Sequence, residues 1–487
     1  MFLGIDVGTS GVKVIIVDER DREIASGTAP LQVDRPHPLW SEQEPDAWWD
    51  ATVAVLDDLA ARSPDAMAGV AAIGLSGQML GVVLLDARDR PIRPALLWND
   101  GRAGSECVDL LSRVPDFIDR VGCRPMPGFS APKILWLSHH EPEAIERTRR
   151  ILLPKDYVRL CLSGEAVTDL ADGSATLLMD TRAGKWSDDI AQASGISTER
   201  LPRLIDSGAV SAELKPELAR RWNLRCRLPI AGGAGDNMCG AVGAGVVKRG
   251  DAFISLGTSG VYFVANDNFV PARGKGMHTH RHAVQGLFAQ HGCVLSAAAA
   301  LSWLMDLLKI ESAEAFLAEI ETADLALDEV PVFSPYLAGE RTPYDDPRAS
   351  ATLSNLRIGM RAAHVGRAIL EGVAFSIADC QDALLEAGAP IERIKLIGGG
   401  ARSRFWAQII ANVIGRPLAI PSKAALGPAL GAARLARQAI GQRLVPEAED
   451  GLEAVVVSPD PAAQEALASR REIHRAHYSA LGHSMNA

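Results

Sequence analysis

One stretch of the chain occurs twice, about half the chain length apart. Residues 5–18 read IDVGTSGVKVIIVD and residues 254–267 read ISLGTSGVYFVAND; seven of the 14 aligned residues are identical, including the complete Gly-Thr-Ser-Gly turn. Each copy has the pattern of two short apolar strands joined by a tight turn. A repeat over half of the chain predicts two similar lobes that face a cleft, and clefts between domains commonly hold ligands.

The spacing of apolar residues predicts alternating strands and helices in both halves. Short apolar runs that end in Gly or Asp are typical of buried strands, and residues 44–63 and 364–388 have helical spacing. The 487 residues exceed what one hydrophobic core usually supports. We therefore predict an α/β fold with an N-terminal domain over residues 1–244 and a C-terminal domain over residues 245–487. Helices after about residue 440 are expected to pack back on a lobe.

The composition argues against several classes of protein. Hydrophobic residues make up 47% and charged residues 23% of the chain, as in ordinary soluble globular proteins. The net charge is -10 without a basic stripe, so we expect no nucleic-acid partner. No apolar run approaches the ~18 residues of a membrane span, and the N-terminus lacks the basic start of a signal peptide. Because no such run is present, we expect no membrane partner. The seven cysteines are scattered without a CxxC pair, so we predict a cytoplasmic protein with free thiols.

The Gly-Thr-Ser-Gly turns have the parts of an anion-binding site. Glycine allows a positive φ and a close approach of the backbone, and the turn offers N–H groups and two hydroxyls. One copy alone would be an ordinary hairpin turn, but two copies in two lobes can hold a polyphosphate from both sides. Neither a Walker A sequence nor a strict GxGxxG is present, so P-loop and dinucleotide-binding folds lose their support. We predict polyphosphate contacts from the turn residues Gly8, Thr9, Ser10, Gly257 and Thr258.

The two copies differ in one carboxylate. Asp6 ends the first strand of the first copy, where the second copy has Ser255. A carboxylate beside a phosphate site repels the ligand unless a cation lies between them, and Mg²⁺ commonly takes one or two carboxylates together with water and phosphate oxygens. One such carboxylate is enough for one ion. We therefore predict that Asp6 holds Mg²⁺; the alternative is an Asp that hydrogen-bonds its neighbouring turn.

Two further glycine-rich segments follow predicted strands. Residues 231–245, AGGAGDNMCGAVGAG, place Asp236 where a helix of small residues starts. A carboxylate there can accept a proton from a substrate hydroxyl as it attacks a terminal phosphate. Its alternative role is the N-cap of the following helix. Residues 396–406, LIGGGARSRFW, offer a flat glycine surface to an adenosine, although glycine runs also serve as plain turns.

Two polar segments of the second half receive structural interpretations. Residues 276–284, GMHTHRHAV, place His278, His280 and His282 on one face if the segment is extended. Such spacing can bind Zn²⁺, but the sequence supplies no further ligand beside them, so a structural role is preferred. The loop SPYLAGERTPYDDP, with its pair Glu340–Arg341, is interpreted as an ordered structural loop near the mouth of the cleft.

Ten segments in chain order resemble the FGGY carbohydrate kinases. They are IDVGTSGVK, WSEQEPDAWW, LLWNDGR, PGFSAPKILWL, LLPKDY, GGAGDN, SLGTSGV, PYLAGERTP, AILEGVAFS and LIGGGARS. The resemblance extends from residue 2 to about residue 435 and is strongest to the bacterial xylulokinases. It implies two actin/Hsp70-like domains of the ribonuclease H type on either side of a catalytic cleft that closes over ATP and a sugar.

The resemblance also implies roles for single residues. It makes Asp236 the proton acceptor and places Asp6 near Mg²⁺. The sugar site is implied for Gln78, Met79, Leu80, Asp100 and Asp236. Contacts with ATP are implied for the first turn with the neighbouring Lys13 and, in the second half, for Gly257, Thr258, Gly399, Gly400 and Ala401.

One residue departs from the pattern of the family. Similar xylulokinases have Gln-Met-His-Gly at the sugar, and this chain has Gln78-Met79-Leu80-Gly81. Leucine cannot hydrogen-bond a hydroxyl, and a buried polar group without a partner costs ~1–3 kcal/mol, or roughly ten- to hundredfold in affinity. Leu80 therefore predicts weaker binding of D-xylulose or a substrate that lacks or reorients that hydroxyl, unless another residue replaces the contact.

These observations together predict an ATP- and Mg²⁺-dependent sugar kinase. It would transfer the γ-phosphoryl group to the terminal 5-hydroxyl of a ketopentose, with D-xylulose as the first candidate and xylulose 5-phosphate as the product. The alternatives are a kinase for another ketose or polyol and an actin- or Hsp70-like nucleotide switch that binds a protein partner. Since FGGY kinases are often dimers, a homodimer is an expectation from the resemblance.

Overall fold

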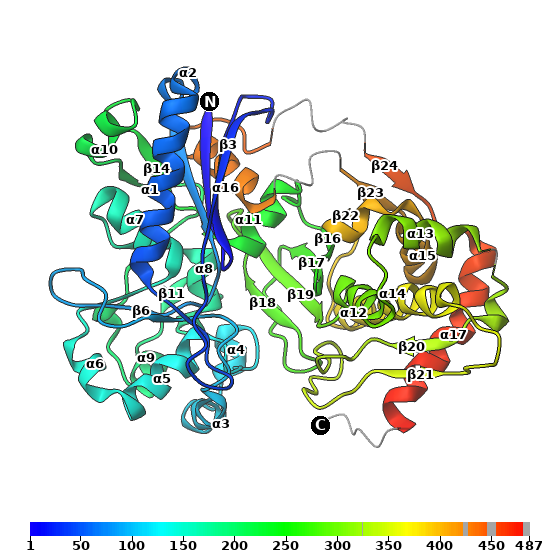
Figure 1. The fold of residues 1–487 in the computed structure, drawn as a ribbon. Helices are drawn as coiled ribbons and strands as arrows, with labels where there is room; N and C mark the ends of the chain where they lie inside the picture. Colours follow the sequence, from blue (N-terminus) through cyan, green and yellow to red (C-terminus); the bar gives the residue numbers. More distant parts are fainter. Residues whose placement is uncertain (324, 422–426, 446–453, 481–487) are drawn as a thin grey trace.

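The computed structural model describes residues 1–487 except residues 324, 422–426, 446–453 and 481–487. The chain forms two lobes that lie side by side, each built around a seven-stranded sheet with helices packed against it (Figure 1). The predicted α/β fold with two sheet-containing lobes is confirmed.

The first sheet contains the first copy of the repeat. Its order is β13-β14-β5-β1-β2-β3, and β15 also pairs with β5. The strands are β1 (Phe2–Val7), β2 (Gly11–Val17), β3 (Glu23–Pro30), β5 (Ala72–Gly77), β13 (Val210–Glu213), β14 (Pro229–Ala231) and β15 (Ala234–Gly235). β1 and β2 form an antiparallel hairpin around the first turn, whereas β5 runs parallel to β1, β14 and β15.

The second sheet repeats this arrangement. Its order is β18-β19-β17-β16-β22-β23-β24. The strands are β16 (Asp251–Leu256), β17 (Gly260–Asn266), β18 (His278–Arg281), β19 (Phe288–Val294), β22 (Arg393–Ile397), β23 (Leu418–Ile420) and β24 (Val455–Val457). β16 and β17 form the second hairpin, and β16 runs parallel to β22. The sequence repeat therefore corresponds to a repeated sheet, with β16 in the place of β1 and β22 in the place of β5.

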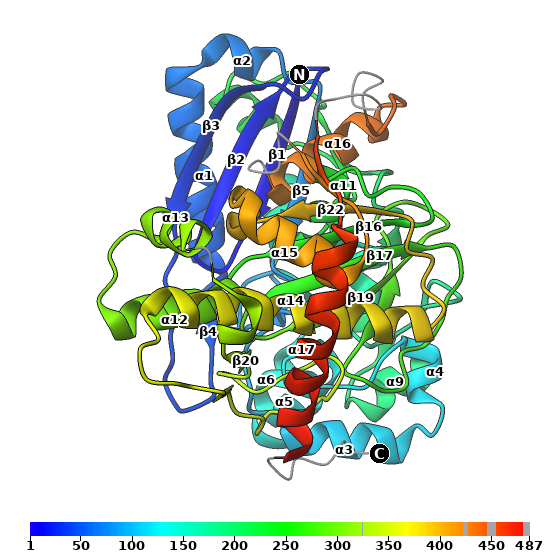
Figure 2. The same cartoon turned by 90° about the vertical axis from the view of Figure 1, so that its right-hand side faces the viewer.

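The two long helices that apolar spacing predicted are present. Helix α1 spans Pro45–Arg62, begins at a proline in its first turn and buries one face that includes Trp48 and Leu56. Helix α14 spans Ala362–Glu386 and is buried along most of its length. Seen from the outer side of the second lobe, α14 is crossed by α17 (Pro461–Ala480), the last helix described (Figure 2). Of the helices expected beyond residue 440, the described part of the chain contains α17, and it packs back on the second lobe as predicted.

One helix of the second half lies against the sheet of the first lobe. Helix α16 (Gly427–Ala439) packs on β1 and β5 and on α11 (Asp236–Gly243), between the two sheets (Figure 1). The approach is so close that a Cβ on Gly4 would lie 2.0 Å from the Ala429 carbonyl oxygen, and one on Gly74 would lie 1.8 Å from that of Ala432. The predicted domain division at residues 244 and 245 stays a prediction. It assigns α16 to the C-terminal domain, although this helix packs on the sheet of the first lobe.

Among the helices in the described ranges, none combines the length and the apolar character needed to cross a membrane.

Candidate active site

The first sheet brings three sequence-predicted segments to one edge. Asp6 of β1 pairs with Ser76 of β5, and Ser76 pairs in parallel with Ala234 of β15. Because the three strands run in the same direction, the segments that follow them leave the sheet together. These segments are the first Gly-Thr-Ser-Gly turn, the loop that starts at Gln78, and the first turn of α11 with Asp236.

Asp6 and Asp236 face the same space at this edge. Burial and the neighbouring charge of Asp6 together raise the pKa of Asp236 to about 7, against a backbone hydrogen bond from Asn237. Burial also raises the pKa of Asp6 to about 6, while Ser76 and Lys13 act in the opposite direction. Asp236 is the first residue of α11 and follows the N-cap residue Gly235, so the N-cap role considered for it is not what the structure has. Its carboxyl instead stands on the wall of a cavity.

The cavity lies between the lobes and has a volume of about 550 Å³. Met79, Leu80 and Asp236 line it from the first lobe, and Val261 and Arg341 line it from the second. Trp98, Asn99 and Phe129 also line it from the first lobe. They lie in the segments LLWNDGR and PGFSAPKILWL, but sequence reasoning gave them no role. Clefts of this size suit small polar ligands when a few polar groups converge on them.

Two predicted sugar-site residues have their polar groups engaged with protein atoms. Gln78 is 1% exposed, accepts a hydrogen bond from Thr9 Oγ1 at 2.9 Å and donates one to Gln43 Oε1 at 2.9 Å. Asp100 touches the cavity wall, but its carboxylate accepts two side-chain hydrogen bonds from Arg102, at 2.8 and 2.7 Å. The structure therefore places Gln78 behind the wall as a support of the first turn, and the carboxylate of Asp100 in an ion pair.

Leu80 occupies an unusual backbone position on the wall. Its φ is +67°, a left-handed conformation that costs a non-glycine residue roughly 1–2 kcal/mol. The conformation is held by its carbonyl oxygen, which accepts hydrogen bonds from Ser130 Oγ at 2.8 Å and Lys133 Nζ at 2.9 Å. Lys133 also donates to the carbonyl oxygens of Leu96 and Leu97, at 3.1 and 2.7 Å. Burial lowers the pKa of Lys133 to about 7.

Lys133 was missed as a functional residue, although the segment PGFSAPKILWL contains it. The available signal was a lysine at a position whose neighbours, Ile134 and Leu135, are apolar. A fully buried lysine requires several acceptors, and here they are the carbonyl groups of Leu80, on the cavity wall, and of Leu96 and Leu97.

A buried ionic network around Lys155 lies next to the segment that leads to Asp236. Lys155 Nζ contacts carboxylate oxygens of Asp156, Asp169 and Asp172 at 2.7, 2.9 and 3.1 Å, with all four side chains inaccessible. Burial raises the pKa of Asp172, and the neighbouring carboxylates of Asp169 and Asp156 act in the same direction, against the charge of Lys155. A Cβ on Gly235 would lie 3.1 Å from Asp172 Oδ1, which places the network directly under the residue before Asp236.

Arg159 extends this support to the glycine loop. Its guanidinium donates to the carbonyl oxygen of Ala231 at 2.6 Å and to that of Gly232. It also contacts Asp156 Oδ1 at 3.3 Å. The strand and loop that lead to Asp236 are therefore fixed by charged hydrogen bonds, which are stronger than neutral ones.

The residues of the second half that were predicted for the nucleotide meet at the corresponding edge of the second sheet. β16 and β22 run parallel, and the second Gly-Thr-Ser-Gly turn and the Gly398–Gly400 loop follow them. Gly398 has a φ of +91° and its Cβ position is 2.7 Å from the Leu256 carbonyl oxygen, so only glycine fits there. Within the described residues nothing lies within 4 Å of a Cβ on Gly399, which leaves an open surface beside Ala401.

The donor set around Asp6 fits a divalent cation. Asp6 Oδ1 is buried and has no hydrogen-bond partner among the described residues. An orphaned carboxylate oxygen next to a second carboxyl is unfavourable without a cation, and Mg²⁺ prefers such oxygen ligands. Asp6 would hold Mg²⁺, and the ion would neutralise the phosphate charge near the turn.

Comparison with known proteins identifies the family. The N-terminal domain of the FGGY family of carbohydrate kinases matches residues 1–243, and its C-terminal domain matches residues 252–440. The chain belongs to the FGGY family of carbohydrate kinases. Among curated FGGY relatives, the xylulose kinase of Escherichia coli (strain K12) is 42% identical over 437 residues, which cover 90% of each chain. The xylulose kinase of Lactococcus lactis is 34% identical and aligns over 89% of this chain and 87% of its own length.

Solved structures of FGGY kinases share the whole fold. A "xyloylose kinase" from Brucella ovis superposes with a TM-score of 0.94 at 38% identity, over 99% of both chains. These matches confirm the predicted pair of actin/Hsp70-like, ribonuclease H-like domains. The FGGY assignment also confirms the predicted class of enzyme, a carbohydrate kinase that uses ATP. It removes the support for a nucleotide switch that acts on a protein partner.

Proposed function

We propose that this FGGY kinase transfers the γ-phosphoryl group of ATP to the 5-hydroxyl of D-xylulose and releases xylulose 5-phosphate and ADP. The observation that carries the proposal is the position of Asp236, a carboxyl with a raised pKa on the wall of the cavity between the lobes. It is supported by relatives named xylulose kinases that align over about nine-tenths of the chain.

Asp236 is the proposed general base. When the 5-hydroxyl oxygen attacks the γ-phosphorus, its proton passes to the Asp236 carboxylate, the new O–P bond forms, and the bond to the ADP oxygen breaks. A pKa of about 7 matches this task, because a base works best when its pKa is close to the working pH. Asn237 N donates to Asp236 Oδ1 at 2.7 Å and so fixes the direction of the carboxyl.

The two turns are the proposed phosphate contacts. Thr9 is held by Gln78, Gln43 and Trp98, so the first turn is preorganised by the first lobe. The second turn is held by backbone bonds from Ala297 and Ala298 at the start of α12 (Ala298–Leu308). Mg²⁺ held by Asp6 would supply the positive charge that balances the transferred phosphoryl group. Gly399, Gly400 and Ala401 are proposed to contact the adenosine.

The sugar specificity depends on Leu80. Its carbonyl oxygen is engaged by Ser130 and Lys133, and its side chain offers the cavity only apolar surface. A second candidate function, phosphorylation of another ketose or of a polyol, is favoured by this apolar wall. Both candidates share the nucleotide site and the base.

A substrate panel distinguishes the two candidates. ADP release is measured with Mg²⁺-ATP and D-xylulose, other pentuloses, pentitols or glycerol, and without a sugar. Selective turnover of D-xylulose is the expected result, and a clearly better sugar elsewhere in the panel would replace D-xylulose as the substrate. Asp236→Asn should lose ~10²–10⁴ of turnover, whereas the matched control Asp65→Asn, at an exposed position, should keep it. Normal turnover of Asp236→Asn would refute the assignment of the base.

A further inference from the structure

Five metal-binding side chains meet where the second sheet faces the first lobe. His278 of β18 pairs directly with His291 of β19. His280 and Cys293 lie two residues further along their strands, so the four side chains share one face of the sheet. Cys123 reaches the same place from the first lobe, where its backbone bridges to Ala272. His278, His280, His291 and Cys293 also line the cavity.

The three imidazoles are buried with unused ring nitrogens. His278, His280 and His291 are 4%, 2% and 6% exposed, and the Nδ1 atom of each has no hydrogen-bond partner among the described residues. A buried polar atom without a partner costs ~1–3 kcal/mol, so three in one place require an explanation.

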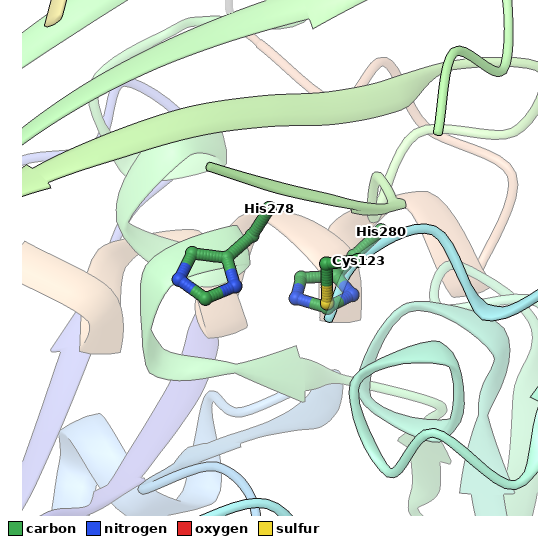
Figure 3. A group of neighbouring side chains, drawn as sticks. All are labelled: Cys123, His278 and His280. Atoms are coloured by element: carbon green, nitrogen blue, oxygen red, sulfur yellow. The ribbon is translucent and has the colours of Figure 1, made fainter. Parts of the chain in front are cut away.

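We propose that Cys123, His278 and His280 bind one zinc ion between the two lobes (Figure 3). Their candidate ligand atoms, one per residue, all lie within 4.8 Å of one another. Zinc bonds to nitrogen and sulfur imply ligand separations of about 3.4 to 3.7 Å in a tetrahedron, so side-chain movements of about 1 Å close the site. Figure 3 shows both imidazoles on the same side of β18, with the thiol of Cys123 beside the ring of His280.

The sequence alone did not support this site, because the third ligand is distant in the chain. Of the HxHxH segment, only His278 and His280 lie in the β18 strand. His282 follows the strand, and its Nδ1 accepts a hydrogen bond from Val284 N at 2.9 Å. The third ligand in the proposed site is therefore Cys123 and not His282, which the HxHxH spacing had suggested.

A second group, His278, His291 and Cys293, shares His278 with the first, so the two groups cannot each hold an ion through that residue. We assign the ion to the first group because its three side chains are all buried, whereas Cys293 is partly exposed.

The neighbouring charge also favours a site with a thiolate. Arg341 Nη1 lies 3.5 Å from His278 Nε2, so a dication here is opposed by a guanidinium. When zinc binds, the Cys123 thiol releases its proton to solvent and a Zn–S bond forms. The thiolate lowers the net charge of the ion and its ligands from +2 to +1. Hydroxyl groups of a sugar could form hydrogen bonds with the imidazoles. They would gain little from the buried Cys123 thiol, because a thiol is a weak hydrogen-bond donor.

A bound ion would connect Cys123 of the first lobe with β18 of the second, at the margin of the cavity. Since lobe closure excludes water from a phosphoryl-transfer site, an ion that fixes the spacing of the lobes inhibits the kinase. The site therefore adds inhibition by zinc to the proposed function without depending on the identity of the sugar.

The test uses Co²⁺ as a spectroscopic substitute for Zn²⁺, with the full chain in the absence of sugar and nucleotide. We expect one equivalent to bind, with a thiolate-to-cobalt charge-transfer band and release of one proton. Cys123→Ser should abolish the band and His280→Gln should weaken binding at least tenfold, while Cys226→Ser, at an exposed free cysteine, should change neither. Zn²⁺ should displace the cobalt and inhibit turnover, and a chelator should restore it.

Two results would overturn the site. The first is a charge-transfer band that survives Cys123→Ser; if that band is lost in Cys293→Ser, the ion belongs to the second group. The second is a protein that binds no metal; if His280→Gln then raises the KM for the sugar, the imidazoles are sugar contacts. Circular dichroism of each variant confirms that it has folded.

Discussion

The raised pKa of Asp236 predicts that the proposed base destabilises the protein that contains it. The pKa rises from 3.8 to about 7 on folding. Since one pKa unit corresponds to 1.36 kcal/mol, ionised Asp236 costs the folded state up to about 4 kcal/mol above pH 7. The side chain keeps partial access to water and part of the shift comes from Asp6, so we expect Asp236→Asn to gain about 2 kcal/mol.

The sign of this effect depends on pH. Well below pH 3.8 the carboxyl is protonated in both the folded and the unfolded chain, and its ionisation contributes nothing to the effect of the substitution. As the pH rises, the unfolded chain ionises first and the folded protein loses relative stability, until the folded carboxyl also ionises near pH 7. The gain of Asp236→Asn should therefore grow between about pH 4 and pH 7 and stay constant above.

Thermal unfolding at about pH 5 and pH 8 measures the difference. For a chain of this length, 2 kcal/mol corresponds to about 2 °C in the unfolding temperature. Asp65→Asn is the matched control, and we expect no difference between the two pH values. A stability gain that is equal at both pH values, or a loss at pH 8, would refute the argument that burial and Asp6 raise this pKa.

Four further predictions concern other parts of the site and fold. The kcat/KM for the sugar should fall about tenfold per pH unit below about pH 7 as Asp236 becomes protonated; a profile that stays flat down to pH 5 would contradict its role. Leu80→His should lower the KM for D-xylulose roughly tenfold in steady-state kinetics, and an unchanged KM would show that another residue already supplies the contact. Lys133→Met removes three hydrogen bonds to carbonyl groups that each keep one other donor, so chemical denaturation should show a loss of about 3 kcal/mol, with a raised KM for sugar and an unchanged KM for ATP. Gly74→Ala should prevent native folding, because its Cβ would lie 1.8 Å from a carbonyl oxygen, whereas Gly104→Ala, with nothing within 4 Å, should be tolerated in solubility and melting assays.

Local turn chemistry explains why much of the nucleotide side was predictable. Both hairpins and the Gly398–Gly400 loop are specified by short segments, and a parallel strand before each segment sets its place at the sheet edge. Asp6 and Asp236 were found for the same reason, since each follows or ends a strand in a recognisable pattern. The roles of these residues remain predictions, while the family, the fold and the class of enzyme are confirmed.

The sugar side was less predictable because its contacts join distant residues. Lys133 is 53 positions from Leu80, whose carbonyl it binds, and a buried lysine has no local sequence signal that names its acceptors. Gln78 was expected on the cavity wall, but its amide faces Thr9 and Gln43. Only the three-dimensional structure shows whether such a polar side chain serves the ligand or the loops around it.

The position of α16 has a consequence for the order in which the protein can be completed during synthesis. The first sheet is composed of residues up to 235, but the helix that covers it ends at Ala439. A ribosome that has released only the first half leaves Gly4 and Gly74 without the backbone that fits against them. Because domains generally fold as they emerge, the first lobe of this chain must wait for nearly the whole polypeptide. A nascent chain arrested after residue 300 should be protease-sensitive in its first sheet, and one arrested well beyond residue 439 should be resistant.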